Sequence, residues 1–254
     1  MEKNEIQLIN KFKEISRIKW IKGISKSTNS VGLTFESLLN KTPDSMYFPD
    51  YYGIEIKCSQ RFSRYPLKLF SLSFDGPELY EMNRLLKKYG KKDLIYKEKL
   101  QLQGNLYTDK YTQINNNYFK LKLDKENKKL TVCVYDLNYQ LIEEKSYIEF
   151  ETIKYRLELK LTKLAVVYAS KKLINNDIYF RYYLITLYKL KSFEKFIELL
   201  EKGYIKVGII GRVSRSGEDA GRQKNKNLVF SIPKEKIEFL FKKTTEYNSD
   251  LSKR

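Results

Sequence analysis

Apolar side chains recur every three to four residues in some stretches of the chain and every second residue in others, which predicts a mixture of helices and strands. Amphipathic helices are expected over residues 3–20, 78–89, 148–163, 193–201 and 233–243. In the first of these helices the apolar stripe consists of Ile6, Ile9, Phe12, Ile15 and Trp20. A further short helix is expected to begin at Gly32, with Leu33, Phe35, Leu38 and Leu39 on its apolar side.

Alternating and continuous apolar runs predict strands between these helices. They are expected at residues 54–59, 67–74, 118–123, 129–135, 139–144, 164–169, 179–187, 204–212 and 228–232. Turn residues between neighbouring runs predict two hairpins, one joining 118–123 to 129–135 and the other joining 164–169 to 179–187. The resulting fold class is α/β (α+β), with a mixed central sheet flanked by helices and a second β-rich lobe.

Four further expectations concern pairing and irregular segments. The strand at 67–74 is expected to pair with 54–59 in the same sheet. Gln103-Gly104-Asn105 and Asn115–Asn117 have the composition of turns. The tail from Thr244 to Arg254 is expected to be frayed.

The length of the chain indicates how many domains it can form, and its net charge indicates the class of binding partner. The chain has 254 residues, enough for one domain or for two lobes that share a core. Its 49 Lys and Arg residues exceed its 31 Asp and Glu residues and leave a net charge of +18, which predicts a polyanionic partner, nucleic acid first and an anionic membrane as the alternative. No apolar run approaches the roughly 20 residues of a membrane span, and the N-terminus does not resemble a signal peptide. We therefore expect a cytoplasmic protein with no membrane partner.

Histidine is absent from the chain, and the two cysteines, Cys58 and Cys133, lack metal-ligand spacing. The absence of histidine excludes histidine general bases, Ser-His-Asp triads, HNH nuclease sites and histidine-ligated zinc. The cysteines are expected to be reduced, in keeping with a cytoplasmic location. Any catalysis must therefore depend on carboxylates, lysine and metal.

The segment from Pro49 to Lys57 contains the most informative cluster of charges. Asp50 precedes a Tyr-Tyr-Gly turn, after which Glu55 and Lys57 alternate with apolar residues. Side chains on a strand repeat every two residues, so Glu55 and Lys57 should share one face while Asp50 folds back beside them. Clustered carboxylates suit a hard divalent cation, and a neighbouring lysine can orient water or stabilise charge on a phosphate.

The tripeptide Glu-x-Lys is by itself a weak signal, because it recurs, for example at Glu143/Lys145 and Glu158/Lys160. A solvated strand edge is the alternative interpretation. Upstream, Glu36 lies near the N-terminal end of the expected short helix, where a carboxylate is favoured by the helix dipole. It supplies a third acid near the cluster.

The spacing Gly-x3-Glu followed by Asp-x4-Glu-x-Lys, from Gly32 to Lys57, resembles the PD-(D/E)xK nucleases, in the branch of MutH and the MvaI/BcnI restriction endonucleases. Three further stretches resemble the MvaI/BcnI pattern in order and rough spacing, over residues 70–78, 188–197 and 212–217. The resemblance extends from about Glu5 to Leu240. It implies a PD-(D/E)xK nuclease core and a β-rich lobe for DNA recognition.

The resemblance implies a type II restriction endonuclease that hydrolyses double-stranded DNA at a short site with Mg²⁺, for which Mn²⁺ is expected to substitute. In that assignment Asp50, Glu55 and the main-chain carbonyl of Ile56 hold the metal. Lys57 positions or activates the attacking water, and Glu36 holds a second metal, a metal-bound water or Lys57 itself. A monomer acting on DNA and a companion methyltransferase in the host are further implications.

Two groups of side chains are candidate DNA contacts. Arg61 and Arg64 follow the catalytic strand and are candidate phosphate clamps, with solvated loop arginines as the alternative. The glycine-bearing loop at residues 211–227 is basic, and the resemblance implies that it contacts the target sequence in the major groove, with a flexible solvated loop as the alternative. Its candidate DNA-binding residues are Arg212, Arg215, Arg222, Lys224, Asn225 and Lys226.

This loop departs from the family pattern, because Gln223–Asn227 stands where many relatives carry a histidine-rich segment. The family's target sequences therefore cannot be transferred to this chain. The expected organisation is a catalytic lobe centred on residues 1–92 and 149–200, a β-rich insert at 93–148 and a recognition segment at 203–243. A MutH-like repair nickase, a cleavage-inactive DNA-binding protein and an RNA-binding protein are the alternative functions.

Overall fold

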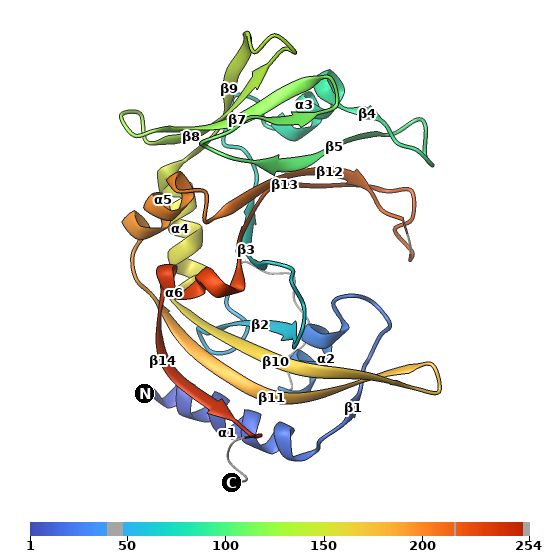
Figure 1. Cartoon of the computed structure of the whole chain (residues 1–254), viewed down its shortest axis with the longest axis vertical. Helices are drawn as coiled ribbons and strands as arrows, with labels where there is room; N and C mark the ends of the chain where they lie inside the picture. Colours follow the sequence, from blue (N-terminus) through green and yellow to red (C-terminus); the bar gives the residue numbers. More distant parts are fainter. Residues whose placement is uncertain (40–47, 216, 251–254) are drawn as a thin grey trace. The chain divides into compact units, whose positions relative to one another are not determined.

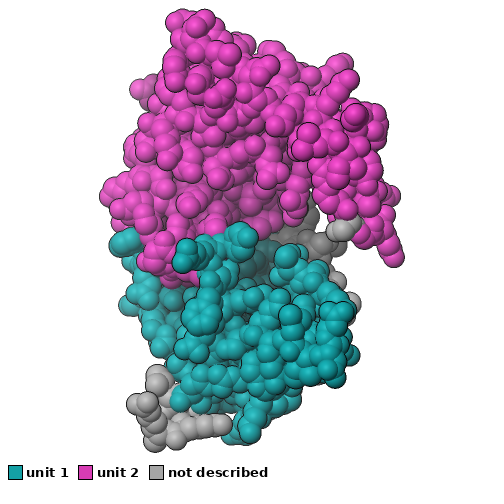
Figure 2. All heavy atoms as spheres, turned by 45° about the vertical axis from the view of Figure 1, so that its right-hand side comes forward, with its two compact units in different colours: residues 1–65, 157–191, 238–254 teal, residues 66–156, 192–237 magenta. Residues whose placement is uncertain are grey.

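A computed structural model describes residues 1–39, 48–215 and 217–250 (Figure 1). The chain folds into two compact units, each assembled from separated segments (Figure 2). Unit 1 comprises residues 1–65, 157–191 and 238–254, and unit 2 comprises residues 66–156 and 192–237. The boundaries differ from the expected ones, because residues 66–92, 149–156 and 192–200 belong to unit 2 and not to the unit that carries the acidic motif.

Unit 1 is built on a mixed five-stranded sheet. Its elements are α1 (Lys3–Arg17), β1 (Ile21–Lys22), α2 (Ser30–Leu38), β2 (Glu55–Gln60), the end of α4 (Phe150–Leu161), β10 (Lys163–Ile174), β11 (Asp177–Leu190), most of α6 (Ile237–Leu240) and β14 (Phe241–Asn248). The strand order is β1-β11-β10-β2, with β14 also paired to β11. Only the pairing of β2 with β10 is parallel among these described strands.

The core of unit 1 lies between this sheet and the helices α1 and α2. Ile54 and Ile56 next to and within β2, together with Ala165 and Val167 of β10, face the buried side chains of both helices. The residues that alternate with them on β2, Glu55 and Lys57, therefore point to the opposite face of the sheet. The expected amphipathic packing of α1 is confirmed for Ile9, Phe12 and Ile15. Ile6 is instead 47% exposed, and Trp20 lies beyond the end of the helix.

Unit 2 contains two antiparallel sheets. Its elements are β3 (Leu67–Leu72), α3 (Glu81–Tyr89), β4 (Lys91–Lys92), β5 (Leu100–Leu106), β6 (Thr112–Ile114), β7 (Asn117–Asp124), β8 (Lys129–Tyr135), β9 (Leu141–Glu149), the start of α4, α5 (Phe193–Glu201), β12 (Lys206–Val213), β13 (Gln223–Ile232) and the 3₁₀ turn Lys234–Lys236. One sheet has the order β3-β13-β12-β5-β4 and the other the order β6-β7-β8-β9.

Several local predictions are confirmed. The two expected hairpins are β7–β8 and β10–β11. On α4 the stripe of Ile153, Leu157 and Leu161 is fully buried. Ser192 caps α5, since its Oγ accepts a hydrogen bond from the amide of Lys195 at 3.1 Å.

Other predictions are wrong, chiefly where a strand's partner is far away in the sequence. The strand at 67–72 pairs with β13 in unit 2 and not with β2. Gln103-Gly104-Asn105 lies inside β5 and is not a turn. The expected helix to Lys243 ends at Leu240, and the chain continues as β14 along β11 instead of fraying at Thr244. Residues 251–254 of the expected tail lie outside the described residues.

The helix α3 also begins later than expected, at Glu81, so that Leu79 lies outside it and is 86% exposed. A buried charge network joins this helix to β9. Arg84 is bound to Glu81 and, at 2.6 Å, to Glu143, which also accepts from Lys88 at 2.6 Å. Glu143, the acid of one of the repeated Glu-x-Lys tripeptides, therefore has a structural partner within unit 2. In the described part of the chain, no helix combines the length and the apolar character needed to cross a membrane.

Candidate active site

The turn that precedes β2 places Asp50 beside the catalytic strand. The main-chain amide of each of Tyr51 and Ile54 donates a hydrogen bond of 2.9 Å to the main-chain carbonyl of the other. Between them, Tyr52 and Gly53 adopt positive φ angles of 42° and 83°. Glycine takes this conformation without the clash of a Cβ atom. The carboxylate of Asp50 then accepts a hydrogen bond from the amide of Ile56 at 2.9 Å. The expected return of Asp50 towards Glu55 is thus present in the structure.

Glu55 is the most buried member of the site, with a side chain that is 1% exposed. Its Oε1 forms an ion pair with the ammonium of Lys57, two residues further along the same face of β2. Its Oε2 is buried and has no hydrogen-bond partner among the described residues. A buried carboxylate oxygen without a partner is costly, so this atom marks a position where a ligand would be favourable.

Lys160 is a second lysine at Glu55, and the sequence did not indicate it. Its Nζ lies 3.4 Å from the same Oε1, and its side chain is 18% exposed. Lys160 occupies the last turn of α4, directly before β10, and the parallel pairing sets Leu164 of β10 opposite Glu55. The topology therefore brings the end of α4 to the start of β2. No local pattern in the sequence carries this signal, and Lys160 belongs to a Glu-x-Lys tripeptide that looks unremarkable by itself.

The electrostatics of the site link Asp50 to Glu55, and Glu36 to Cys58 of the same strand. Burial raises the pKa of Glu55 above its ordinary value; the ammonium of Lys57 opposes this shift, and Asp50 adds to it. The pKa of the Cys58 thiol is raised by burial and, in addition, by the carboxylates of Glu36 and Asp50. Glu36 therefore contributes negative charge beside β2 from helix α2. Because α2 runs from Ser30 to Leu38, Glu36 lies in its last turn, and the expected position near the N-terminal end of the helix is wrong.

The donor set fits a divalent metal ion of the Mg²⁺ type. Among the residues that the structure describes, no three acidic, histidine or cysteine side chains form a ready-made cluster for a metal. Mg²⁺ is commonly held by only one or two carboxylates together with substrate phosphates and water, so a full protein cage is not required. Asp50 and the partnerless oxygen of Glu55 would supply these carboxylates, next to the carbonyl of Ile56.

The two candidate phosphate clamps lie just beyond the C-terminal end of β2. Arg61 and Arg64 are both exposed. The guanidinium of Arg61 lies 5.6 Å from the ring centroid of Tyr183, and its amide donates to the carbonyl of Ala169 at 3.0 Å. These contacts fix the backbone of Arg61 against β10 and leave its side chain at the surface of unit 1.

The second candidate region is an exposed face of the sheet in unit 2, called here the polar face. Its residues lie on β3, β13, β12 and β5, alternate with buried ones and are Lys68, Ser71, Gln103, Asn105, Lys206, Gly208, Ile210, Arg212, Lys224, Asn227, Val229 and Ser231. The opposite face is closed by apolar packing, for example of Phe230 against Phe196 of α5, with ring centroids 5.9 Å apart. Apart from Ile210 and Val229, the side chains on this side of the sheet are basic or neutral polar, which is a surface suited to nucleic acid.

The segment expected to be a recognition loop, 211–227, is partly strand. Residues 211–213 end β12 and residues 223–227 begin β13, while residues 214–222 connect the two strands; residue 216 among them lies outside the described part. A β-bulge at Lys226 changes the register, because Ile210 pairs with Asn227 whereas Gly211 pairs with Asn225. Burial, followed by the nearby charges of Arg212 and Lys224, lowers the pKa of Lys226. Three of the predicted cations therefore gather at this end of the hairpin.

The remaining predicted contacts have partners within unit 2. Arg215 forms a bidentate ion pair with Asp93, whose side chain is fully buried and whose pKa this arginine lowers to about 2. Arg222 and Lys224 both bind Asp219, at 2.9 and 2.6 Å. Asn225 donates to the side chain of Asn83 on α3 at 2.6 Å. Arg212 differs from these residues, since it forms no salt bridge with the acidic side chains that the structure describes.

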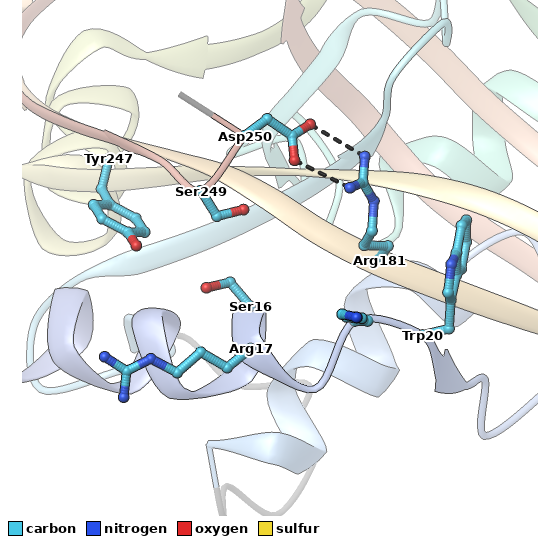
Figure 3. A pocket seen from close by; sticks show the side chains of 8 residues that line it. Ser16, Arg17, Trp20, Arg181, Tyr247, Ser249 and Asp250 are labelled. Atoms are coloured by element: carbon cyan, nitrogen blue, oxygen red, sulfur yellow. Dashed lines mark hydrogen bonds and ion pairs between the residues drawn. The ribbon is translucent and has the colours of Figure 1, made fainter. Parts of the chain in front are cut away.

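A pocket of about 590 Å³ lies elsewhere on unit 1, at the end of α1 and beside β11 and β14 (Figure 3). Its described lining consists of Ser16, Arg17, Lys19, Trp20, Arg181, Tyr247, Ser249 and Asp250. Arg181 and Asp250 form a bidentate pair at 3.0 and 3.1 Å. Because Asp50 and Glu55 are not among its described lining residues, this pocket is not the candidate active site.

Comparisons with known proteins agree with this arrangement. The sequence model of the MvaI/BcnI restriction endonuclease family matches residues 9–241. A solved structure of restriction endonuclease MvaI in complex with its cognate DNA is 27% identical and superposes with a TM-score of 0.89, covering 96% of this chain and 98% of the other. A structure of MvaI in the absence of DNA is 25% identical, with a TM-score of 0.60 over the same shares of the two chains. A search of curated protein sequences found no match. With a family match over almost the whole chain, and with Asp50 held beside Glu55 and Lys57 of β2, this protein belongs to the MvaI/BcnI restriction endonuclease family, a family of DNA endonucleases.

Proposed function

We propose that this protein is a type II restriction endonuclease that hydrolyses phosphodiester bonds of double-stranded DNA at a short specific site and requires Mg²⁺. The observation that carries the proposal is Glu55, a buried carboxylate with one oxygen bound by lysines and the other without a partner, directly beside Asp50. The structural likeness to MvaI bound to its cognate DNA supports double-stranded DNA as the substrate.

In this proposal the carboxylates of the site bind the metal ion, and Lys57 orients the attacking water. Asp50 is held in place by the Ile56 amide and presents its carboxylate next to Glu55. Lys57 shares Oε1 of Glu55, so its ammonium is positioned to orient the attacking water and to stabilise negative charge at the scissile phosphate. Bound Mg²⁺ would lower the pKa of a coordinated water and neutralise charge on the phosphate. Glu36 is assigned a supporting role, through a metal-bound water or a second ion.

Unit 2 would supply binding and selectivity. The cations of the polar face suit the phosphate backbone, and their exposed position allows contact with a duplex. We further propose that the enzyme acts as a monomer in the cytoplasm and that a companion methyltransferase protects the host's own target sites. Mn²⁺ is expected to replace Mg²⁺.

The direct test is incubation of supercoiled plasmid with the purified protein and Mg²⁺, followed by sequencing of the DNA ends. Linear products with one recurring end sequence are expected, and Asp50→Ala should abolish them. Ca²⁺ should support binding without cleavage, because it can be held by the same oxygen ligands but is less suited to the reaction. Efficient cutting in Ca²⁺ alone, or equal cutting by Asp50→Ala, would contradict the assigned site. Salt-sensitive DNA binding with no cutting in any metal would indicate a cleavage-inactive binder.

A further inference from the structure

The strand β5 carries two exposed side-chain amides on the polar face. Gln103 and Asn105 were expected in a turn, yet they lie within β5 and point to the polar face. The residues that alternate with them, Leu102 and Leu106, are 0% and 1% exposed on the opposite face. The orientation of both amides is therefore fixed by the burial of their neighbours.

The strand is also held firmly against its surroundings. Between the two amides, Gly104 packs so closely on Ile114 of β6 that a Cβ atom there would lie 2.5 Å from its Cδ1. On the other side, β5 is paired with β12, with Gln103 opposite Ile210 and Asn105 opposite Gly208. A slip of one residue would force a side chain into the Ile114 contact, so the register of β5 is strongly specified.

Neither amide has a partner within the protein. Among the described residues, the side chains of Gln103 and Asn105 form no hydrogen bond, in contrast to Asn225, which is bound to Asn83, and Asn227, which is bound to Ser73 at 3.2 Å. Gly208, opposite Asn105, has no side chain that could cover this amide. Even a Cβ atom added at Gly208 would lie 3.8 Å from Oδ1 of Asn105. The two amides are thus presented to the exterior without obstruction from the neighbouring strand.

Charge on the polar face is arranged around these amides. Arg212 and Lys224 form a cross-strand pair at one end, and Lys206 lies at the other end, near Lys68 through their common neighbour Ser231. Gln103 and Asn105 lie between these cations, two residues apart on one strand, a separation of about 7 Å. This separation is roughly two base steps of 3.4 Å. Cations at the ends suit two stretches of phosphate backbone, and neutral amides in the middle suit base edges.

We propose that Gln103 and Asn105 are specificity-determining residues that contact base edges in the major groove of the target DNA, with A·T base pairs as their preferred partners. Each amide can form a bidentate pair only with adenine, where its NH2 group donates to the N7 acceptor and its oxygen accepts from the N6 amino group. This inference rests on the proposed function, since it assigns the target preference of the same DNA-cleaving enzyme. It also gives the polar face a sequence-selective role that its cations alone cannot provide.

The test uses the full-length protein and measures binding in Ca²⁺, so that it does not depend on cleavage. Once the ends of a wild-type digest define the target, dissociation constants are measured for the target, for each single base-pair replacement and for a random duplex. Gln103→Ala and Asn105→Ala should each weaken target binding about 5- to 150-fold, the range for a bidentate base contact. Each should lose discrimination at one A·T pair, while binding to the random duplex changes less than about twofold.

Two further variants show whether the effect depends on the chemistry of the amide and on its position in the polar face. Gln103→Glu replaces the amide by an acceptor of similar shape and should shift the preference at its base pair towards cytosine, whose N4 is a donor. Gln140→Ala, an exposed glutamine in the β8–β9 turn, is the matched control and should leave all dissociation constants unchanged. Thermal denaturation of each variant confirms that unit 2 remains folded.

The outcomes separate the two proposals. Wild-type selectivity that survives both alanine substitutions would overturn the role of the amides and leave the restriction endonuclease intact. Equal losses on target and random DNA would also overturn it, by showing that the amides contact only the backbone. A wild-type protein that neither selects nor cuts any DNA sequence would overturn both proposals together.

Discussion

The two units use charge in opposite ways. In unit 1 the charged groups are buried and shared: Glu55 is 1% exposed and holds Lys57 and Lys160 on a single oxygen. In unit 2 the predicted DNA contacts lie at the surface, and three of the six are already bound to Asp93 or Asp219. A buried cluster depends on every member, because removal of one partner leaves an uncompensated charge. On an exposed surface, each single substitution should lower the DNA affinity by a smaller amount.

The strongest test of this contrast is the substitution Lys57→Ala. Without this ammonium, Glu55 keeps only the more distant Lys160, and the attacking water loses its positioning group. We expect the cleavage rate to fall by about 10²–10⁴-fold, while DNA binding in Ca²⁺ changes only a few-fold. Single-turnover cleavage and equilibrium binding measure the two effects. Lys145→Ala, an exposed lysine in another Glu-x-Lys tripeptide, is the matched control and should cleave normally.

Lys160→Ala tests whether the second lysine belongs to the same cluster. Its loss should misplace Glu55 and lower the cleavage rate about 10- to 100-fold, a smaller effect than that of Lys57→Ala because its contact is longer. Removal of a positive charge beside the proposed metal ligands should also reduce the Mg²⁺ concentration needed for half-maximal activity. A purely structural role would leave this Mg²⁺ dependence unchanged.

The charge-conserving variant Lys160→Arg should restore the Mg²⁺ dependence and part of the rate. Lys154→Ala, on the same helix α4, serves as the control for helix stability. If Lys160→Ala cleaves like the wild type across the whole Mg²⁺ range, Lys160 is a bystander at Glu55.

Lys57 and Lys160 show which parts of the site can be predicted from the sequence and which cannot. Asp50, Glu55 and Lys57 lie within one turn and one strand, so local rules of side-chain alternation and turn geometry predict that they meet. Lys160 meets them only because β10 runs parallel to β2, and no local pattern states which strands pair. The same limitation explains the wrong partner of β3. Alternation indicates a strand and its buried face, whereas its neighbour is determined by the packing of the whole unit.

The polar face was harder to predict than the catalytic strand. The basic composition of residues 211–227 correctly located a charged hairpin, yet it could not distinguish Arg212 from Arg215. Arg215 is bound to Asp93, which lies 122 residues away in the sequence. Gln103 and Asn105 were mistaken for turn residues because glycine and asparagine favour turns, and the contact of Gly104 with Ile114 that favours a strand is invisible in the local sequence.

Arg212→Ala and Arg215→Ala therefore sharpen the comparison within unit 2. Arg212 lacks an acidic partner among the described residues, so its removal should cost about 1–3 kcal/mol of binding free energy at the target site. Arg215→Ala should instead act on stability, because it leaves the buried carboxylate of Asp93 without its guanidinium. Binding measurements in Ca²⁺ and thermal denaturation of both variants separate these effects. An equal loss for Arg212→Ala on random DNA would identify a backbone contact.

The smallest expected effect concerns the pH dependence of the Asp93–Arg215 pair. Arg215, helped by the amides of Tyr96 and Ile95 and opposed by burial, lowers the pKa of Asp93 to about 2, whereas an unfolded aspartate has a pKa of about 3.9. A carboxylate with a depressed pKa stabilises the folded state fully above the unfolded value, and this contribution is lost as the pH falls towards the folded value. The Tm of Asp93→Asn should therefore lie below that of the wild type at pH 6. The gap should narrow as the pH falls below about 4, while the exposed control Glu98→Gln shows little difference from the wild type at pH 6. A gap that stays constant between pH 6 and pH 3 would mean that Asp93 acts through packing and its backbone hydrogen bonds, and not through its charge.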